Sequence, residues 1–223
     1  MNDPKYYEAY DQRYLTAHKQ GISWFSSVYS PIVLATIEKY RIHPSMKLLE
    51  LGCGEGRDAV ALLKDGFDLL ATDISPEAIR YCRQLLPEKA DHFAILDCVN
   101  GHLQAKFDFI YAVAVIHMLV LQEDRDQFYR FIRDHLSQSG IGLICTMGDG
   151  QMQVESDISK AFSLQERDCR GQKMMVAGTS CKMVAKDDFL QEIQKSGLRI
   201  LEFGHTSVPG EFTEMMYAVV QLG

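Results

Sequence analysis

The 223-residue sequence predicts an α/β fold, a doubly wound sheet of seven strands that is mostly parallel and has an antiparallel last strand. Three observations lead to this prediction. Short strands that are apolar on both faces alternate with amphipathic helices, as in a parallel sheet covered on both sides. A glycine-rich turn follows the first strand and leads into a helix. The connection from Gly204 to Glu214 is too short for a parallel crossover, so the last two strands should run antiparallel.

The individual elements follow from apolar runs and from helix caps. Ser30-Pro31 and Ser75-Pro76 each place a capping hydroxyl before proline, a residue that suits the first helical position. The helices are expected at 31–40, 57–65, 76–86, 123–136 and 186–196. The strands are expected at 47–51, 68–72, 92–96, 107–113, 141–147, 199–204 and 215–222.

We expect one domain over residues 1–223, with two additions to the sheet. The first is an N-terminal helical arm over residues 1–44. Its Tyr6, Tyr10 and Tyr14 are spaced four apart on one helix face, and the arm also carries Tyr7. This aromatic stripe either closes over a ligand as a lid or docks the arm onto the domain. The second is a cap-like insertion over residues 148–185, with a strand-like run at 173–177, which we interpret as a cap over the substrate.

Bulk composition restricts the class of partner. The net charge is −7 and the basic residues form no stripe, which favours a small-molecule partner over nucleic acid. No apolar run reaches the ~20 residues of a membrane span, and the N-terminus lacks the pattern of a secretory signal. The six cysteines are scattered, as is usual for thiols in a reducing compartment. We therefore expect a cytoplasmic protein without a membrane partner.

The turn after the first strand carries the strongest functional signal. The segment Glu50-Leu51-Gly52-Cys53-Gly54-Glu55-Gly56 has glycine at three alternate positions, where the backbone can contact a ligand without a Cβ in the way. A dinucleotide-binding turn has the pattern G-x-G-x-x-G, and here Arg57 occupies the position of the last glycine. Glu50 adds a carboxylate, which suits an ammonium group better than a diphosphate. The pattern therefore disfavours a nicotinamide dinucleotide.

This segment resembles the first motif of the class I S-adenosylmethionine-dependent methyltransferases. The resemblance extends by order of elements from residue 47 to the C-terminus, including the final antiparallel strand. It implies that S-adenosyl-L-methionine is the cofactor and that no metal is needed. The Asn/Asp-Pro-Pro-aromatic signature of enzymes that methylate amino groups of bases is absent after the fourth strand, which is a further argument against a nucleic-acid substrate.

The predicted cofactor residues lie at the ends of the first four strands. Asp73 ends the second strand 21 residues after Gly52, the spacing expected of an acid that binds ribose hydroxyls. The resemblance assigns the adenine amino group to Asp97, which follows the third strand, and a ring nitrogen to the next backbone N–H. The full predicted set is Glu50, Gly52, Cys53, Gly54, Gly56, Asp73, Ile74, Asp97, Cys98 and Val113.

His117 is the candidate catalytic residue, as a general base or as a residue that orients the substrate. A packed histidine at the start of a helix is an equal alternative. Two other functions stay open at this stage, a nicotinamide-dependent oxidoreductase and a non-catalytic module that binds S-adenosylmethionine. The sequence does not identify the methyl acceptor, the oligomeric state or the role of Cys169 and Cys181.

Overall fold

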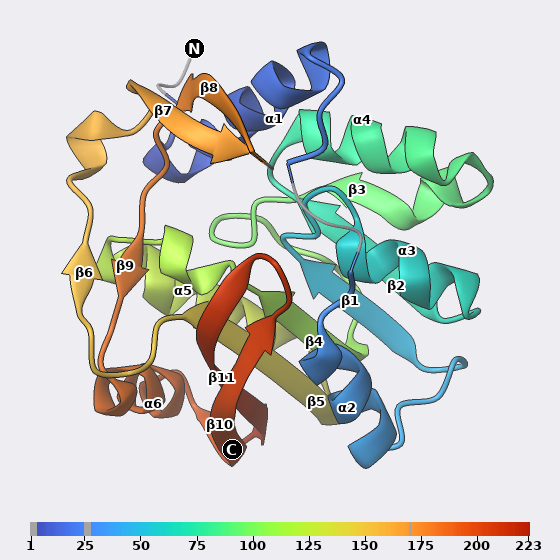
Figure 1. Ribbon diagram of the computed structural model, residues 1–223. Helices are drawn as coiled ribbons and strands as arrows, with labels where there is room; N and C mark the ends of the chain where they lie inside the picture. Colours follow the sequence, from blue (N-terminus) through green and yellow to red (C-terminus); the bar gives the residue numbers. More distant parts are fainter. Residues whose placement is uncertain (1–3, 25–27, 170) are drawn as a thin grey trace.

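A computed structural model describes residues 4–24, 28–169 and 171–223 of the chain. Its centre is a seven-stranded sheet with the order β10-β11-β5-β4-β1-β2-β3 (Figure 1). Strands β1 to β5 pair in parallel, whereas β11 is antiparallel to both β5 and β10. The predicted doubly wound sheet with an antiparallel last strand is confirmed.

Strands β1 to β4 begin within one residue of the predicted starts. Strands β10 and β11 extend further than predicted because antiparallel partners satisfy each other's backbone groups even where the side chains are polar. Strand β5 begins at Leu136 and not at residue 141, and Leu136 pairs with Phe107 of the parallel strand β4. The strands are β1 Lys47–Leu51, β2 Asp68–Asp73, β3 Phe93–Ile95, β4 Phe107–Val113, β5 Leu136–Met147, β10 Leu198–Val208 and β11 Phe212–Leu222.

Helices cover both faces of the sheet. Residues of α2, α3 and α4 pack in one apolar cluster and residues of α5 and α6 in another. Side chains alternate between these clusters along each strand: Leu48 lies in the first and Leu49 in the second. The helices are α1 Ala9–Lys19, α2 Pro31–Lys39, α3 Arg57–Lys64, α4 Pro76–Leu85, α5 Gln122–His135 and α6 Lys186–Lys195, with short 3₁₀ helices η1 Tyr6–Glu8, η2 Pro87–His92, η3 Ile116–Met118 and η4 Ile158–Lys160. None of the helices within the described ranges is long and apolar enough to cross a membrane.

The two predicted serine caps behave differently. The Ser75 hydroxyl accepts from the Ala78 backbone N–H at 3.0 Å and caps α4 as predicted. Ser30 is the N-cap residue of α2, as predicted, but its hydroxyl makes no cap bond: it donates to Asp58 Oδ2 at 2.8 Å and so joins the start of α2 to the first turn of α3. A carboxylate is the stronger acceptor and determines where this hydroxyl points.

The arm and the insertion lie against each other at one edge of the sheet. Figure 1 shows α1 beside the hairpin of β7 (Leu164–Cys169) and β8 (Gln172–Ala177), and Arg13 joins them by donating to the Ala177 carbonyl at 2.9 Å. The remaining strands of the insertion, β6 (Val154–Glu155) and β9 (Lys182–Met183), pair with each other. The predicted run at 173–177 belongs to β8, whereas β7 is polar and gave no sequence signal. Residues 1–3 and 25–27 of the predicted arm lie outside the described residues.

Candidate functional site

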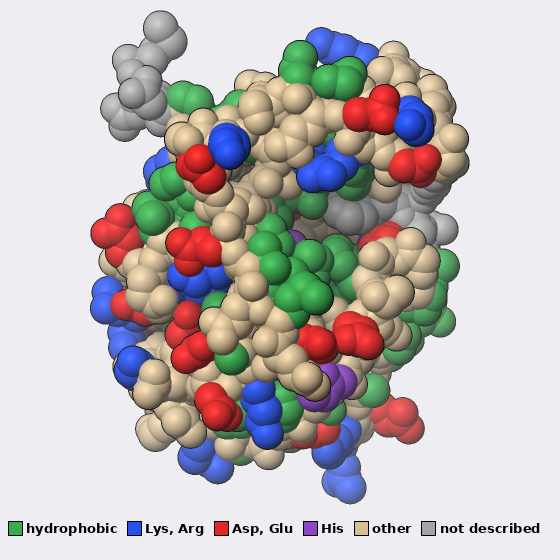
Figure 2. All heavy atoms as spheres, turned by 60° about the vertical axis from the view of Figure 1, so that its left-hand side comes forward, with side chains coloured by type: hydrophobic (Ala, Val, Ile, Leu, Met, Phe, Trp, Pro, Cys, Tyr) green, Lys and Arg blue, Asp and Glu red, His purple; other side chains and the backbone are tan. Residues whose placement is uncertain are grey.

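A cavity of about 920 Å³, measured with its open mouth, lies at the carboxyl ends of β1, β2, β3 and β4. This is the edge where ligands bind in open α/β sheets. Hydrophobic side chains gather around the hollow in the face shown in Figure 2. The cavity walls are formed by Tyr7, Tyr10, Tyr14, Gly52, Cys53, Gly54, Glu55, Arg57, Asp73, Ile74, Leu96, Asp97, Cys98, Val99, Val113, Ala114, Val115, Met118, Leu119 and Phe212.

The glycine turn forms the centre of the cavity floor. Gly52 has φ +71°, and a Cβ built on it would lie 2.4 Å from Val115 Cγ2. Both the left-handed backbone and the close approach of the segment after β4 therefore require glycine at this position. Gly54 also has positive φ, and its N–H donates to the carboxylate of Asp73 at 2.8 Å.

Asp73 lies at the end of β2 as predicted and lines the cavity. One carboxylate oxygen accepts from the Gly54 N–H and the other from the Ser75 N–H at 2.9 Å. Burial raises the pKa of this carboxyl above its ordinary value, although the backbone bonds oppose the shift. The bonds leave acceptor capacity on both oxygens, which vicinal hydroxyls of a ligand can use.

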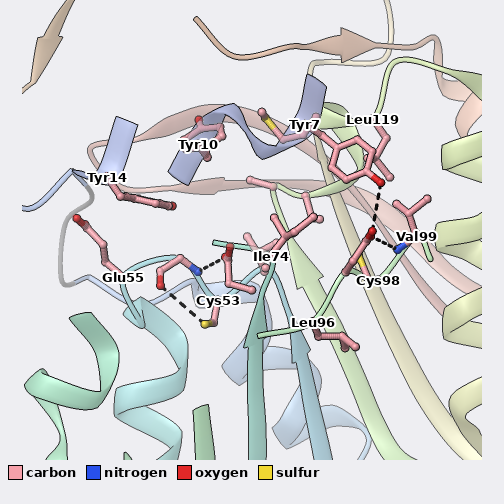
Figure 3. A pocket seen from close by; sticks show the side chains of 18 of the residues that line it. Tyr7, Tyr10, Tyr14, Cys53, Glu55, Ile74, Leu96, Cys98, Val99 and Leu119 are labelled. Carbon is pink, nitrogen blue, oxygen red and sulfur yellow. Dashed lines mark hydrogen bonds between the residues drawn. The ribbon is translucent and has the colours of Figure 1, made fainter. Parts of the chain in front are cut away.

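Asp97 follows β3 and is held by the arm as well as by its own loop. Its Oδ2 accepts from Lys5 Nζ at 2.7 Å and from the Tyr7 hydroxyl at 3.4 Å, while Oδ1 accepts from the Val99 N–H at 2.9 Å. Burial alone would raise its pKa, but the bonds from Lys5 and Val99 outweigh burial and hold the pKa below its ordinary value. Asp97 is therefore ionised, and it lines the cavity. The neighbouring Cys98 also lines the cavity (Figure 3).

Two predicted cofactor residues do not reach the cavity wall. Glu50 points to the other side of the turn, where its carboxylate accepts from the Tyr111 hydroxyl at 3.0 Å. Burial and the nearby Asp58 raise the pKa of Glu50 well above its ordinary value. Gly56 has φ +80° at the start of α3 and packs under Cys82. The other eight predicted residues line the cavity.

His117 lies beside the cavity and not in its wall. The side chain is 4% exposed, and Nδ1 has no hydrogen-bond partner among the described residues. The ring meets the edge of Phe212, a cavity residue, at 6.2 Å between centroids. Burial, with a smaller effect of Arg125, lowers the pKa of His117 to about 4. The imidazole is therefore neutral at pH 7, and its role as a base stays a prediction.

The arm forms the roof of the cavity. Tyr7, Tyr10 and Tyr14 line it (Figure 3), at the i, i+3, i+7 spacing of one helix face. The predicted stripe included Tyr6, which turns away: its hydroxyl accepts from the Val120 N–H at 2.9 Å and donates to Asp124 at 2.7 Å. The spacing of Tyr7, Tyr10 and Tyr14 was the signal that could have identified the correct face.

The insertion supports the roof instead of lining the cavity. None of its described residues lies in the cavity wall, so the prediction that it caps the substrate is not supported by the lining. Cys169 is buried next to the Ser23 and Trp24 carbonyls, and Cys181 follows the loop after β8. Neither thiol lines the cavity. Among the described residues, no group of three histidine, cysteine or acidic side chains lies close enough together to hold a metal ion.

Sequence reasoning missed several cavity residues that come from distant segments. Phe212 is the first residue of β11, and Arg57 holds the preceding turn by donating to Glu211. Met118 and Leu119 enter from η3 and the residue after it. The sequence analysis named Glu55 only as a member of the glycine turn and did not predict that it lines the cavity. No local pattern marks these positions, because the contacts that bring them together are made between distant parts of the chain.

Comparisons with known proteins agree with this geometry. The family described as "Methyltransferase domain" matches residues 49–141, the segment from the first strand to the fifth. Hemagglutinin 1 of Eikenella corrodens is 33% identical over 109 residues, which are 46% of this chain and 35% of that protein. A probable S-adenosyl-L-methionine-dependent methyltransferase TehB of Haemophilus influenzae is 24% identical over 125 residues, 54% of this chain and 43% of the relative. The chain thus matches less than half the length of these curated relatives.

A solved structure shows the same fold. The glycopeptide N-methyltransferase MtfA, crystallised with (S)-adenosyl-L-methionine, superposes with a TM-score of 0.63 at 20% sequence identity. The superposition covers 85% of this chain and 86% of that one. At this identity the likeness concerns the fold alone.

Proposed function

We propose that the chain is a class I S-adenosylmethionine-dependent methyltransferase and that it transfers a methyl group from S-adenosyl-L-methionine to a small-molecule acceptor. The observation that carries the proposal is the set of groups on the cavity floor. The glycine turn is followed by a carboxylate at the end of β2 and by another after β3, with apolar walls between them.

The residues present fit an adenosine that carries an amino acid. Asp73 can accept from ribose hydroxyls and Asp97 from an adenine amino group, while Ile74 and Leu96 offer apolar surface to a base. Gly52, Cys53, Gly54, Cys98 and Val113 complete the proposed cofactor set. Glu50 and Gly56 do not line the cavity, so they would support the conformation of the glycine turn and would not contact the cofactor.

The same groups do not suit a diphosphate. Three acidic residues, Glu55, Asp73 and Asp97, line the cavity. The one arginine in the cavity wall, Arg57, is already paired with Glu211. The first turn of α3 also carries Asp58, whose carboxylate accepts from the Ser30 N–H at 2.6 Å. A diphosphate would meet acids where a dinucleotide-binding site presents unpaired N–H groups.

The contribution of the protein to the reaction is to bind, align and exclude water. When bound, S-adenosyl-L-methionine supplies a methyl group on a positively charged sulfur, which makes this group reactive toward a nucleophile. Holding two reactants close and in line can supply ~7–11 kcal/mol of the barrier. Tyr7, Tyr10 and Tyr14 cover the cavity from above and thereby keep water from the reacting groups.

Besides the acids, the cavity wall is largely apolar and aromatic, and it includes Tyr10, Tyr14, Met118, Leu119 and Phe212. Such walls favour a compact molecule with an apolar body over a phosphate-rich polymer. MtfA, a solved structure of the same fold, is a glycopeptide N-methyltransferase, which supports an acceptor other than nucleic acid.

Calorimetric titration with S-adenosylhomocysteine tests the proposal, with NADH as the competing ligand. We expect a single site for S-adenosylhomocysteine and no heat with NADH. At 100 times its Kd the nucleoside should stabilise the fold by ~2.7 kcal/mol. Binding of NADH without binding of S-adenosylhomocysteine would contradict the proposal. Label transfer from the methyl donor into a metabolite extract separates an enzyme from a module that only binds the donor.

A further inference from the structure

His18, a residue of α1 that no motif identified, lies between two carboxylates. Its Nε2 is 2.7 Å from Glu55 Oε1, and its Nδ1 is 2.6 Å from Glu77 Oε1. The histidine side chain is 7% exposed, and both carboxylates are similarly buried. One ring therefore joins the arm both to the glycine turn and to the first turn of α4.

Two ionised carboxylates at these distances are both satisfied only by a doubly protonated ring. A neutral imidazole has one N–H, so it could donate to only one of the two carboxylates. The other nitrogen would then place a lone pair against a carboxylate oxygen. An imidazolium donates to both, and hydrogen bonds between ionised groups are the short and strong ones. The titratable and charged groups around the ring are Glu55 from the turn, Glu77, Arg80 and Tyr81 from α4, and Tyr14 from its own helix.

Glu55 is the side chain through which this contact reaches the cavity. It lies between Gly54 and Gly56 in the turn, lines the cavity, and points toward the arm (Figure 3). The Ser23 hydroxyl and the Trp24 N–H also donate to its carboxylate, at 2.8 and 2.7 Å. The backbone of the turn is fixed from the opposite side by the bond from the Gly54 N–H to Asp73.

We propose that His18 is a positioning residue for the methyl donor: its imidazolium binds Glu55 and thereby holds the glycine turn in the conformation that receives the nucleoside. The inference rests on the proposed function, because the turn is taken to hold S-adenosylmethionine. It extends that function by making donor affinity depend on an ion pair from the arm. The side chain of His18 does not line the cavity, so it acts through Glu55.

The test compares S-adenosylhomocysteine affinity by calorimetry in the full chain and in three variants, His18→Gln, Glu55→Gln and the double variant. Each single variant should raise Kd about tenfold, the effect of one charge-assisted hydrogen bond. The double variant should be no weaker than the single ones, because both remove the same contact. Tyr6→Phe is the matched control, since Tyr6 fastens the other end of the arm and lies outside the cavity wall. Its Kd should stay within about twofold of the parent value.

Long-range proton–nitrogen spectra of the His18 ring give a second readout, which tests the ion pair in the parent chain and does not depend on the folding of a variant. At pH 7 both ring nitrogens should carry a proton, also in the chain without ligand. A single-proton tautomer there would overturn the inference, even if the substituted chains failed to fold.

The binding outcomes separate the inference from the proposed function. Absence of binding in the parent chain would contradict the proposed function itself. Tight binding in the parent with an unchanged Kd in His18→Gln would overturn only the role of His18. An equal loss in Tyr6→Phe would also overturn it, because the effect would then come from general loosening of the arm.

Discussion

The floor and the roof of the cavity are held in place in different ways. On the floor, Asp73 bonds to the N–H of Ser75 two residues later, and Thr72 bonds to the carbonyl of Glu50 in the adjacent strand. On the roof, Arg13 bonds to Ala177, 164 residues away, and Lys5 bonds to Asp97, 92 residues away. The floor belongs to the central sheet, whereas the roof is attached to it by side chains.

The difference indicates that the roof can open while the floor stays folded. Local opening of a segment takes less free energy than global unfolding when few buried apolar contacts hold the segment. The apolar cluster around Cys169, Met174 and Val176 that joins α1 to the hairpin is small beside the two clusters that flank the sheet. Changes in the floor should therefore affect the whole fold, and changes in the roof should affect access to the cavity.

Arg125→Gln should have the largest effect, because Arg125 anchors the floor segment after β4. The side chain is fully buried, pairs with Glu192 at 2.7 and 2.9 Å, and donates to the Ile116 and Leu119 carbonyls. Its loss leaves a buried carboxylate without its cation, which should cost about 3–5 kcal/mol in urea unfolding. Arg133→Gln on the same helix, at a half-exposed position, should cost less than about 1 kcal/mol. Equal losses of unfolding free energy in the two variants would contradict the role of Arg125 as the anchor of the segment after β4.

His117 should make the fold sensitive to acid. Its pKa is lowered to about 4 in the folded chain, against about 6.5 when exposed, so the unfolded chain takes up the proton first as pH falls. The stability from the neutral ring is complete above pH 6.5 and is lost as pH falls toward 4. The loss amounts to about 3 kcal/mol over this window.

Urea unfolding at pH 7 and pH 4.5 would measure this effect in the parent chain and in His117→Gln. The variant should lose less stability on acidification. If His117 were instead the general base, turnover in the variant would collapse while the affinity for S-adenosylhomocysteine stayed unchanged.

Gly52→Ala should weaken donor binding about 100-fold, because the added methyl meets Val115 on the cavity floor. Gly21→Ala is a matched control on the arm: Gly21 has the same φ of +71°, but an added Cβ there would have no atom within 4 Å. Both variants carry the same backbone strain, so the difference between their Kd values isolates the steric contact. Similar Kd values would show that close packing at Gly52 is unimportant.

Arg13→Gln should have the smallest effect on the fold as a whole. Arg13 lies over the rings of Tyr10 and Trp24 and fastens α1 to β8. Its removal should speed hydrogen exchange in residues 9–19 by about tenfold, the effect of losing roughly 1–1.5 kcal/mol of local stability. The melting temperature should change little. Equal acceleration throughout the sheet would contradict a separately opening roof.

The sequence predicted the floor better than the roof for a physical reason. Strand β1, the glycine turn and the start of α3 are consecutive, so apolar pattern and glycine spacing suffice to place Gly52 and Gly54. Asp73 and Asp97 could be placed because parallel strands bring their carboxyl ends to one edge. The sequence could not predict on which side of the turn the Glu50 side chain lies, because that depends on the hydrogen bond from Tyr111 in the neighbouring strand β4.

The roof depends on contacts between distant segments, which no local sequence pattern predicts. The helical pattern of the arm allowed several faces, and the contact of Tyr6 with Val120 determines the one observed. β7 has mostly polar side chains, so its pairing with β8 could not be read from hydrophobic alternation. Phe212 reaches the cavity, and His18 reaches Glu55, only through contacts between segments far apart in the chain.

A crystal structure with S-adenosylhomocysteine would examine floor and roof together. We predict that the ribose lies against Asp73 and the adenine beside Asp97, with Tyr7, Tyr10 and Tyr14 above the ligand. A nucleoside bound away from the glycine turn, or a cavity that excludes it while accepting NADH, would contradict the assignment.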